Sequence, residues 1–130
     1  MTFDPRDTYV RLAVDGKAET FAGGDGFWRL APVEMERIAA GWMIAEFTFD
    51  RDWPNWEMHP NSDEFVYLTS GHVELLLEKP GGTERVELRG RGAILVPRGI
   101  WHTAVIHATS TLLHVTLGAG TEQRPFTRSC

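Results

Sequence analysis

Four side chains that can bind a divalent metal are concentrated in two short stretches of the sequence. Glu57, His59 and Glu64 lie within Glu57-Met58-His59-Pro60-Asn61-Ser62-Asp63-Glu64, and the fourth side chain is that of His102. Imidazole and carboxylate ligands together suit Fe, Mn, Ni, Co or Zn and disfavour Cu(I), which prefers thiolates. The sequence therefore predicts one divalent-metal site with ligands drawn from Glu57, His59, Glu64 and His102.

The spacing of these residues indicates which elements must position them. Glu57 and His59 are two residues apart, which places their side chains on the same face of a β-strand. Glu64 follows a short Pro-Asn-Ser-Asp turn. His102 has to reach the same place from another strand.

Short strands separated by turn-forming residues account for most of the chain. Asp15-Gly16 suits a tight hairpin turn between two of them. Residues 32–40 fit neither the helical nor the strand period cleanly, and Pro32 favours a short helix there. Residues 42–49 are apolar enough for a strand buried on both faces. The expected strands are residues 10–14, 17–21, 42–49, 64–68, 72–78, 85–88, 93–96, 103–107 and 111–117. Their regular spacing predicts an all-β, antiparallel sandwich or barrel.

Composition and charge narrow the class of protein. The chain has 130 residues, 42% of them hydrophobic and 24% charged, and a net charge of -5. This length predicts a single domain over residues 1–130. The negative charge argues against nucleic acid and anionic membranes as partners. No apolar run is long enough for a membrane helix, and no signal peptide is visible at the N-terminus, so we expect a cytoplasmic protein.

Two motifs in the sequence resemble those of the cupin superfamily. The first cupin motif has a His-x-His pair, three or four residues, Glu, six residues and Gly. Glu57, His59, Glu64 and Gly71 match this spacing, with Glu57 in place of the first histidine. The second motif has Pro-x-Gly, two residues and His, and the stretch from Pro97 to His102 matches that core.

The resemblance implies a small, single-domain cupin with an antiparallel jelly-roll β-barrel. Residues 41–118 would form the barrel core, and residues 1–40 would add edge strands and a loop. His59, Glu64 and His102 are the metal ligands that the resemblance carries over. A carboxylate at position 57 gives either two histidines and two glutamates around the metal, or two histidines and one glutamate with Glu57 outside the coordination sphere.

The remaining histidines and the tryptophans lie outside the ligand positions. We expect His72 to be solvated and His107 to point outward, because it is out of phase with His102. His114 is a candidate for the barrel interior, where it would act as a general base or a substrate contact. Trp56 and Trp101 alternate away from Glu57 and His102, and we expect Trp101 to pack between sheets.

Three classes of function are compatible with these residues. One is a metal-dependent dioxygenase or other oxidoreductase that acts on a small organic molecule inside the barrel. Another is a sugar isomerase or epimerase, and the third is a non-catalytic protein that binds a small ligand. No catalytic residue is assigned. Exposed strand edges also predict a homodimer.

Overall fold

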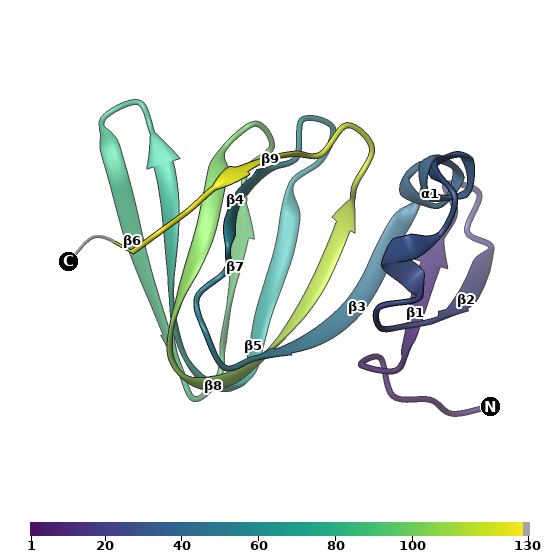
Figure 1. Cartoon of the computed structure of the whole chain (residues 1–130), viewed down its shortest axis with the longest axis horizontal. Helices are drawn as coiled ribbons and strands as arrows, with labels where there is room; N and C mark the ends of the chain where they lie inside the picture. Colours follow the sequence, from purple (N-terminus) through teal and green to yellow (C-terminus); the bar gives the residue numbers. More distant parts are fainter. Residues whose placement is uncertain (129–130) are drawn as a thin grey trace.

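The computed structural model describes residues 1–128 and consists mainly of antiparallel β-strands. Nine strands in this part of the chain form one curled sheet, with the β1–β2 hairpin and α1 at one end of the molecule (Figure 1). The strands are β1 (Thr8–Leu12), β2 (Ala18–Ala22), β3 (Trp42–Phe49), β4 (Asn55–Met58), β5 (Glu64–Lys79), β6 (Gly82–Arg89), β7 (Gly92–Val96), β8 (Trp101–Leu117) and β9 (Glu122–Pro125). The expected all-β fold class is therefore confirmed.

Two long strands organise the sheet and bring distant parts of the chain together. β5 pairs with β6, β7 and β8, and β8 pairs in turn with β3 and β4. The sequence predicts each of these strands as two shorter ones, which is wrong. In β8 the pairing continues through Ala108 and Ser110, which face His72 and Phe49 on the neighbouring strands.

A β-bulge in β5 replaces the turn expected at residues 69–71. The register with β8 shifts between Leu68 and Val73, and Gly71 has a φ of 107°. A Cβ atom at Gly71 would lie 2.6 Å from the Ser110 Cα, so only glycine fits both this backbone conformation and this close approach. The bulge allows β5 to bend, so that its first part pairs with β7 and its second part pairs with β6.

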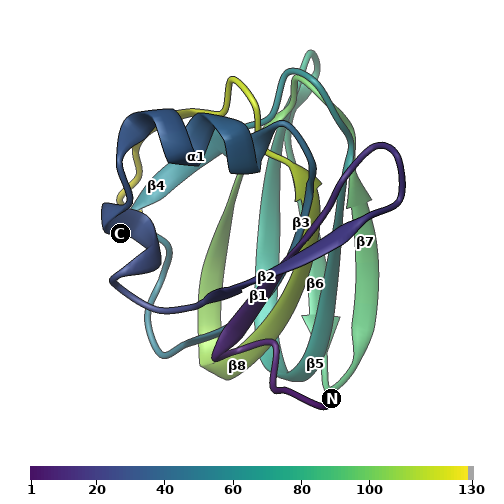
Figure 2. The same ribbon diagram turned by 90° about the vertical axis from the view of Figure 1, so that its right-hand side faces the viewer.

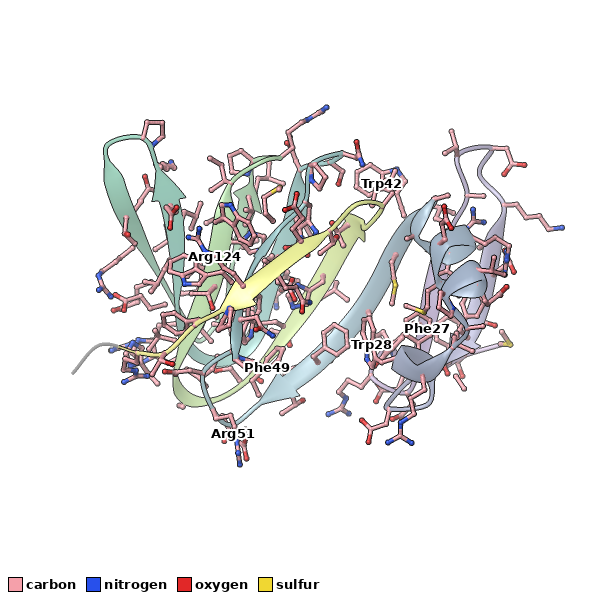
Figure 3. The ribbon with its side chains drawn as sticks, turned by 45° about the horizontal axis from the view of Figure 1, so that its top comes forward. Phe27, Trp28, Trp42, Phe49, Arg51 and Arg124 are labelled. Carbon is pink, nitrogen blue, oxygen red and sulfur yellow. The ribbon has the colours of Figure 1, made fainter. Side chains whose placement is uncertain are left out.

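The two faces of β3 have different surroundings. Ala45 is its single buried residue in the described structure, and the other residues of the strand are half-buried or exposed. The expectation of burial on both faces is therefore wrong, because one face lines a cavity and the other is partly open to solvent. Trp42 and Phe49 mark the two ends of this strand in Figure 3.

A short helical segment closes one end of the sheet. η1 (Phe27–Arg29) and α1 (Pro32–Ala39) precede β3, and α1 crosses one end of the strands in Figure 2. Pro32 takes the first helical position, where its missing N–H is no loss, and this settles the ambiguous segment as a helix. Ile38 is buried in a small apolar cluster with Tyr9, Phe27 and Ala45. Neither helix is long and apolar enough to cross a membrane.

Candidate metal centre

Three strands that lie side by side place Glu57 beside His102, the second candidate ligand histidine. In β4, Glu57 is the cross-strand partner of His102 on β8 and of Gln123 on β9. Directly opposed residues of antiparallel strands have neighbouring side chains on the same face of the sheet. Gln123 Nε2 donates to Glu57 Oε1 at 3.5 Å, and about a third of the Glu57 side chain is exposed.

His59 follows the last residue of β4 and is held by both its backbone and its ring. The N–H of Gly99, from the second motif, donates to the His59 carbonyl at 2.9 Å. The His59 Nδ1 lies 2.8 Å from Thr121 Oγ1, and the Thr121 hydroxyl donates to the Gly118 carbonyl at 2.7 Å. Because the hydroxyl proton is used there, Thr121 accepts a hydrogen bond from Nδ1–H. The buried Nε2 of neutral His59 then carries a lone pair, and it has no hydrogen-bond partner.

The ring of His102 is also held by an oxygen acceptor at its Nδ1. Its Nδ1 lies 3.0 Å from the Ile100 carbonyl, which can only accept, so Nδ1 carries a proton. Its Nε2 lies 3.1 Å from Glu64 Oε1, and the residue is fully buried. Burial lowers the pKa of His102, but the hydrogen bond and charge of Glu64 outweigh this effect and raise that pKa above its ordinary value. The space beside His102 Nε2 and the Glu64 carboxylate therefore favours a positive charge.

Glu64, the first residue of β5, is a buried carboxylate surrounded by imidazoles. Its Oε1 lies 3.1 Å from His102 Nε2 and 3.5 Å from His59 Nε2, and its Oε2 lies 3.4 Å from His114 Nδ1. Burial raises the pKa of Glu64, but hydrogen bonds from His102 and His114 lower it well below the usual range. The carboxylate is thus held ionised inside the protein.

The spacing of these atoms fits ligands around one metal ion. Metal–ligand bonds of about 2.0–2.2 Å, at angles of about 90–110°, place neighbouring ligand atoms about 2.8–3.6 Å apart. The distances from Glu64 Oε1 to the two Nε2 atoms fall in this range, and His59 Nε2 lies slightly farther, at 3.8 Å, from Glu57 Oε2. Ligand atoms of Glu57, His59 and His102 all lie within 4.8 Å of one another, a group that does not include Glu64. The donor set and the partnerless His59 Nε2 both fit a divalent cation.

A mainly apolar cavity of about 620 Å³ opens onto these residues. Its walls come from β3, β8, the segment before β4, and the helical segment 27–39. Apolar and aromatic side chains predominate, and they include Trp28, Met35, Ile38, Met43, Phe47, Phe49 and Trp53. The polar part of the lining consists of Asn55, Glu57, His59, Glu64, His114, Thr116, Thr121 and Gln123.

The other histidines agree with the sequence in part. His114 lines the cavity and is 8% exposed, and His107 is exposed on the outside of the sheet as expected. His72 was predicted to be solvated, and this prediction is wrong. Its side chain is 21% exposed, because it stacks against the His107 ring at a centroid distance of 4.7 Å.

Trp56 and Trp101 do not line the cavity that holds the candidate ligands, in agreement with the expectation that they alternate away from Glu57 and His102. Arg124 on β9 covers the rings of Trp56 and Trp101, with its guanidinium carbon 5.3 and 4.5 Å from the two centroids. Trp101 therefore packs under an arginine and not between two sheets as expected.

Three polar residues of the site are absent from the sequence-based prediction. Thr121 and Gln123 come from the C-terminal segment, and β9 has no alternating apolar pattern that would identify it as a strand. Trp53 precedes β4 in an irregular segment, yet its ring lies 5.7 Å from the His114 ring. Trp53 lies four residues before Glu57 in the sequence, but no periodic pattern there indicates that its ring lines the cavity.

Comparison with solved structures identifies the fold. A cupin-2 domain protein from Shewanella frigidimarina matches 58% of this chain and 69% of its own, with 12% identity and a TM-score of 0.50. An oxalate oxidase matches at 14% identity with a TM-score of 0.52, and covers 62% of this chain and 44% of its own. The Bacillus subtilis oxalate decarboxylase, described with Mn(II) centres, matches at 16% identity with a TM-score of 0.51. The match covers 65% of this chain and 23% of the decarboxylase chain.

The chain therefore has the cupin jelly-roll fold that the two motifs imply. The matched part is less than half the length of the two oxalate enzymes. No protein-family model matches the sequence, and comparison with curated proteins finds no match.

Proposed function

We propose that this protein binds one divalent metal ion through Glu57, His59, Glu64 and His102. The observation that carries the proposal is the orientation of the two imidazole rings. Each ring has its Nδ1 engaged by an oxygen acceptor, which leaves both Nε2 atoms directed at the Glu64 carboxylate. Outer partners that fix the tautomer in this way are typical of metal-ligating histidines.

Metal analysis of protein purified without a histidine tag tests this proposal. We expect about one equivalent of divalent metal per chain, and a loss of most of it in His59→Ala. His72→Ala is the matched control, because His72 also has a buried Nε2 without a partner but lies outside the cavity. A wild-type protein that takes up no Fe, Mn, Ni, Co or Zn after incubation would refute the proposal, as would full occupancy in His59→Ala.

The finer proposal is a metal-dependent oxidoreductase that acts on a small organic molecule in the cavity. Its support is the position of the ligands at the wall of a cavity large enough for such a molecule, together with the fold shared with an oxalate oxidase. A bound metal would supply Lewis acidity and, for Fe or Mn, redox chemistry at positions that the protein leaves open.

The chain's own groups would position the substrate and exclude water. The apolar walls remove water from the reacting end of the substrate, which strengthens electrostatic interactions there. His114 can exchange a hydrogen bond with a substrate through its Nε2, which is buried without a partner. Its other ring nitrogen, Nδ1, lies 3.4 Å from Glu64 Oε2. Glu64 holds the opposite side of that ring and fixes its orientation.

Oxygen uptake by the Fe(II)-loaded protein tests the oxidoreductase. Small diketones, aromatic acids, phenols and thiol acids form the substrate panel. We expect uptake with at least one compound, and its loss in His102→Ala but not in His72→Ala. Protein that carries stoichiometric metal but consumes no oxygen across the panel would favour a non-catalytic binding protein and overturn this finer proposal.

A further inference from the structure

Buried polar atoms without partners gather around the apolar cavity. Within residues 1–128, five buried side-chain nitrogen or oxygen atoms have no hydrogen-bond partner. Four of them belong to residues that line the cavity, namely Trp53, His59, His114 and Thr116. Because buried polar groups in native proteins are nearly always paired, such a cluster calls for an explanation. A metal accounts for His59 Nε2, which leaves Trp53 Nε1, His114 Nε2 and Thr116 Oγ1.

The chemistry of these three atoms defines what would satisfy them. The indole N–H of Trp53 can only donate a hydrogen bond. His114 Nδ1 faces the Glu64 carboxylate, which only accepts, so Nε2 is the ring nitrogen left to bond a ligand. The Thr116 hydroxyl can donate or accept. The ring centroids of Trp53 and His114 lie 5.7 Å apart, so both atoms belong to one part of the cavity wall, and a hydroxyl group that reaches both would bond to each.

The remainder of the wall favours an apolar body. Phe47 packs against His114 at a centroid distance of 5.5 Å, and Phe49 packs against Trp53 at 5.6 Å. The helical segment adds Met35, so the ring end of a ligand would lie among aromatic and thioether groups.

The charges around the cavity favour a neutral ligand. The described lining residues include the carboxylates of Glu57 and Glu64 but no lysine or arginine. Without a bound metal, an anionic ligand would meet these carboxylates with only the imidazoles that already contact Glu64 to compensate the like charge. A sugar would also bring hydroxyl groups to the mainly apolar part of the wall, and each group left unpaired there would weaken binding.

We infer that the cavity binds a neutral aromatic molecule with a hydroxyl group, of the phenol or naphthol type, held between Trp53, His114 and Thr116. This deepens the proposed function and rests on it for the reaction at the metal, while binding itself depends on Trp53, His114 and Thr116. The cavity volume of about 620 Å³ lies within the range of small-molecule sites.

Calorimetric titration of metal-free, untagged protein with 2-naphthol, 2-naphthoate and glucose tests the inference. We expect 2-naphthol to bind at one site, about tenfold or more tightly than 2-naphthoate, since one like charge in a poorly solvated site readily costs this factor. Glucose should not bind measurably. Equal or tighter binding of glucose, or absence of 2-naphthol binding, would overturn the inference.

Two variants test the proposed hydrogen bonds. Trp53→Phe keeps an aromatic ring but loses the N–H, and Thr116→Val keeps the shape but loses the hydroxyl. Each should weaken 2-naphthol binding about 2- to 10-fold, the range of one hydrogen bond. Trp42→Phe is the matched control because Trp42 does not line the cavity. Wild-type affinity in both test variants, or an equal loss in the control, would contradict the inference.

The metal proposal and the ligand inference can fail separately. If the protein takes up no metal but binds 2-naphthol with the expected variant effects, the metal proposal fails and the ligand inference stands. If it takes up metal but does not bind 2-naphthol with or without Zn²⁺, the ligand inference fails alone. With both correct, Zn²⁺ should strengthen binding of 2-naphthoate more than binding of 2-naphthol, because the carboxylate then has a cation to meet.

Discussion

The hydroxyl of Thr121 should control metal affinity although it does not contact the metal. It accepts the hydrogen bond from His59 Nδ1 at 2.8 Å and so keeps the proton away from Nε2. In Thr121→Val this acceptor is lost, and the tautomer with the proton on Nε2, which cannot bind a metal, becomes competitive. Loss of a partner for a buried polar group costs about 1–3 kcal/mol. Loss of such an outer hydrogen bond typically lowers metal affinity about 10- to 100-fold, or about 1.4–2.7 kcal/mol. The two ranges agree.

Competition with a chromophoric chelator for Zn²⁺, on untagged and metal-stripped protein, measures this effect. Thr121→Ser keeps the hydroxyl and should retain affinity close to that of wild type. Thr111→Val removes a hydroxyl that bonds Thr48 on the exposed outer surface, and should leave Zn²⁺ affinity unchanged. The reasoning is refuted if Thr121→Val binds Zn²⁺ as tightly as wild type, or if Thr121→Ser loses as much affinity as Thr121→Val.

Two further predictions concern the scaffold. Gly71→Ala should lower the free energy of unfolding by about 2 kcal/mol or more, because its φ of 107° and the nearby Ser110 backbone both oppose a Cβ atom. Gly81→Ala, in an open turn without positive φ, should change it by less than about 1 kcal/mol; equal urea midpoints for the two variants would contradict this. The Asp52 carboxylate accepts hydrogen bonds from Arg128, which lower its pKa below the ordinary value. Its ionic contribution to stability is therefore complete above about pH 4 and is lost as the pH falls through the lowered pKa. Urea unfolding of wild type and Asp52→Asn should differ at pH 7 and converge in acid, and a pH-independent difference would disprove this role.

The sequence predicted strand-forming segments better than strand lengths. Turn residues between apolar runs marked the β1–β2 hairpin and the connections around β6 and β7 correctly. The same signal misled at Gly71, because a glycine with positive φ serves a bulge as well as a turn. Local composition does not separate the two cases, since the difference lies in whether a neighbouring strand continues the hydrogen-bond ladder.

The proximity of the four candidate ligands was predictable because motif spacing reports strand alternation. Glu57, His59, Glu64 and His102 meet in the structure as that spacing implies. His114 was accessible to the same reasoning, since it lies on the inward face of β8. The supporting residues were not predictable. Thr121 reaches His59 from a loop 62 residues away, and no local pattern encodes such a contact.

The apolar character of the cavity was also only partly visible in the sequence. Alternation along β3 places Phe47 and Trp42 on opposite faces, and Phe47 is the one that lines the cavity. The contribution of α1 was not foreseen, because its helical state itself was uncertain. The packing of Met35 and Ile38 over the open end depends on tertiary contacts with β3.

The wide separation of the ligands along the chain has a consequence for the order in which the protein folds. Glu64 and His102 are 38 residues apart, and they meet only after β5 has paired with β8. Closing loops of this length is slow, and partners that distant come together late in the folding of sheet proteins. A cation bound by these residues would then stabilise the native state more than the transition state for folding. It would slow unfolding strongly while leaving the folding rate nearly unchanged.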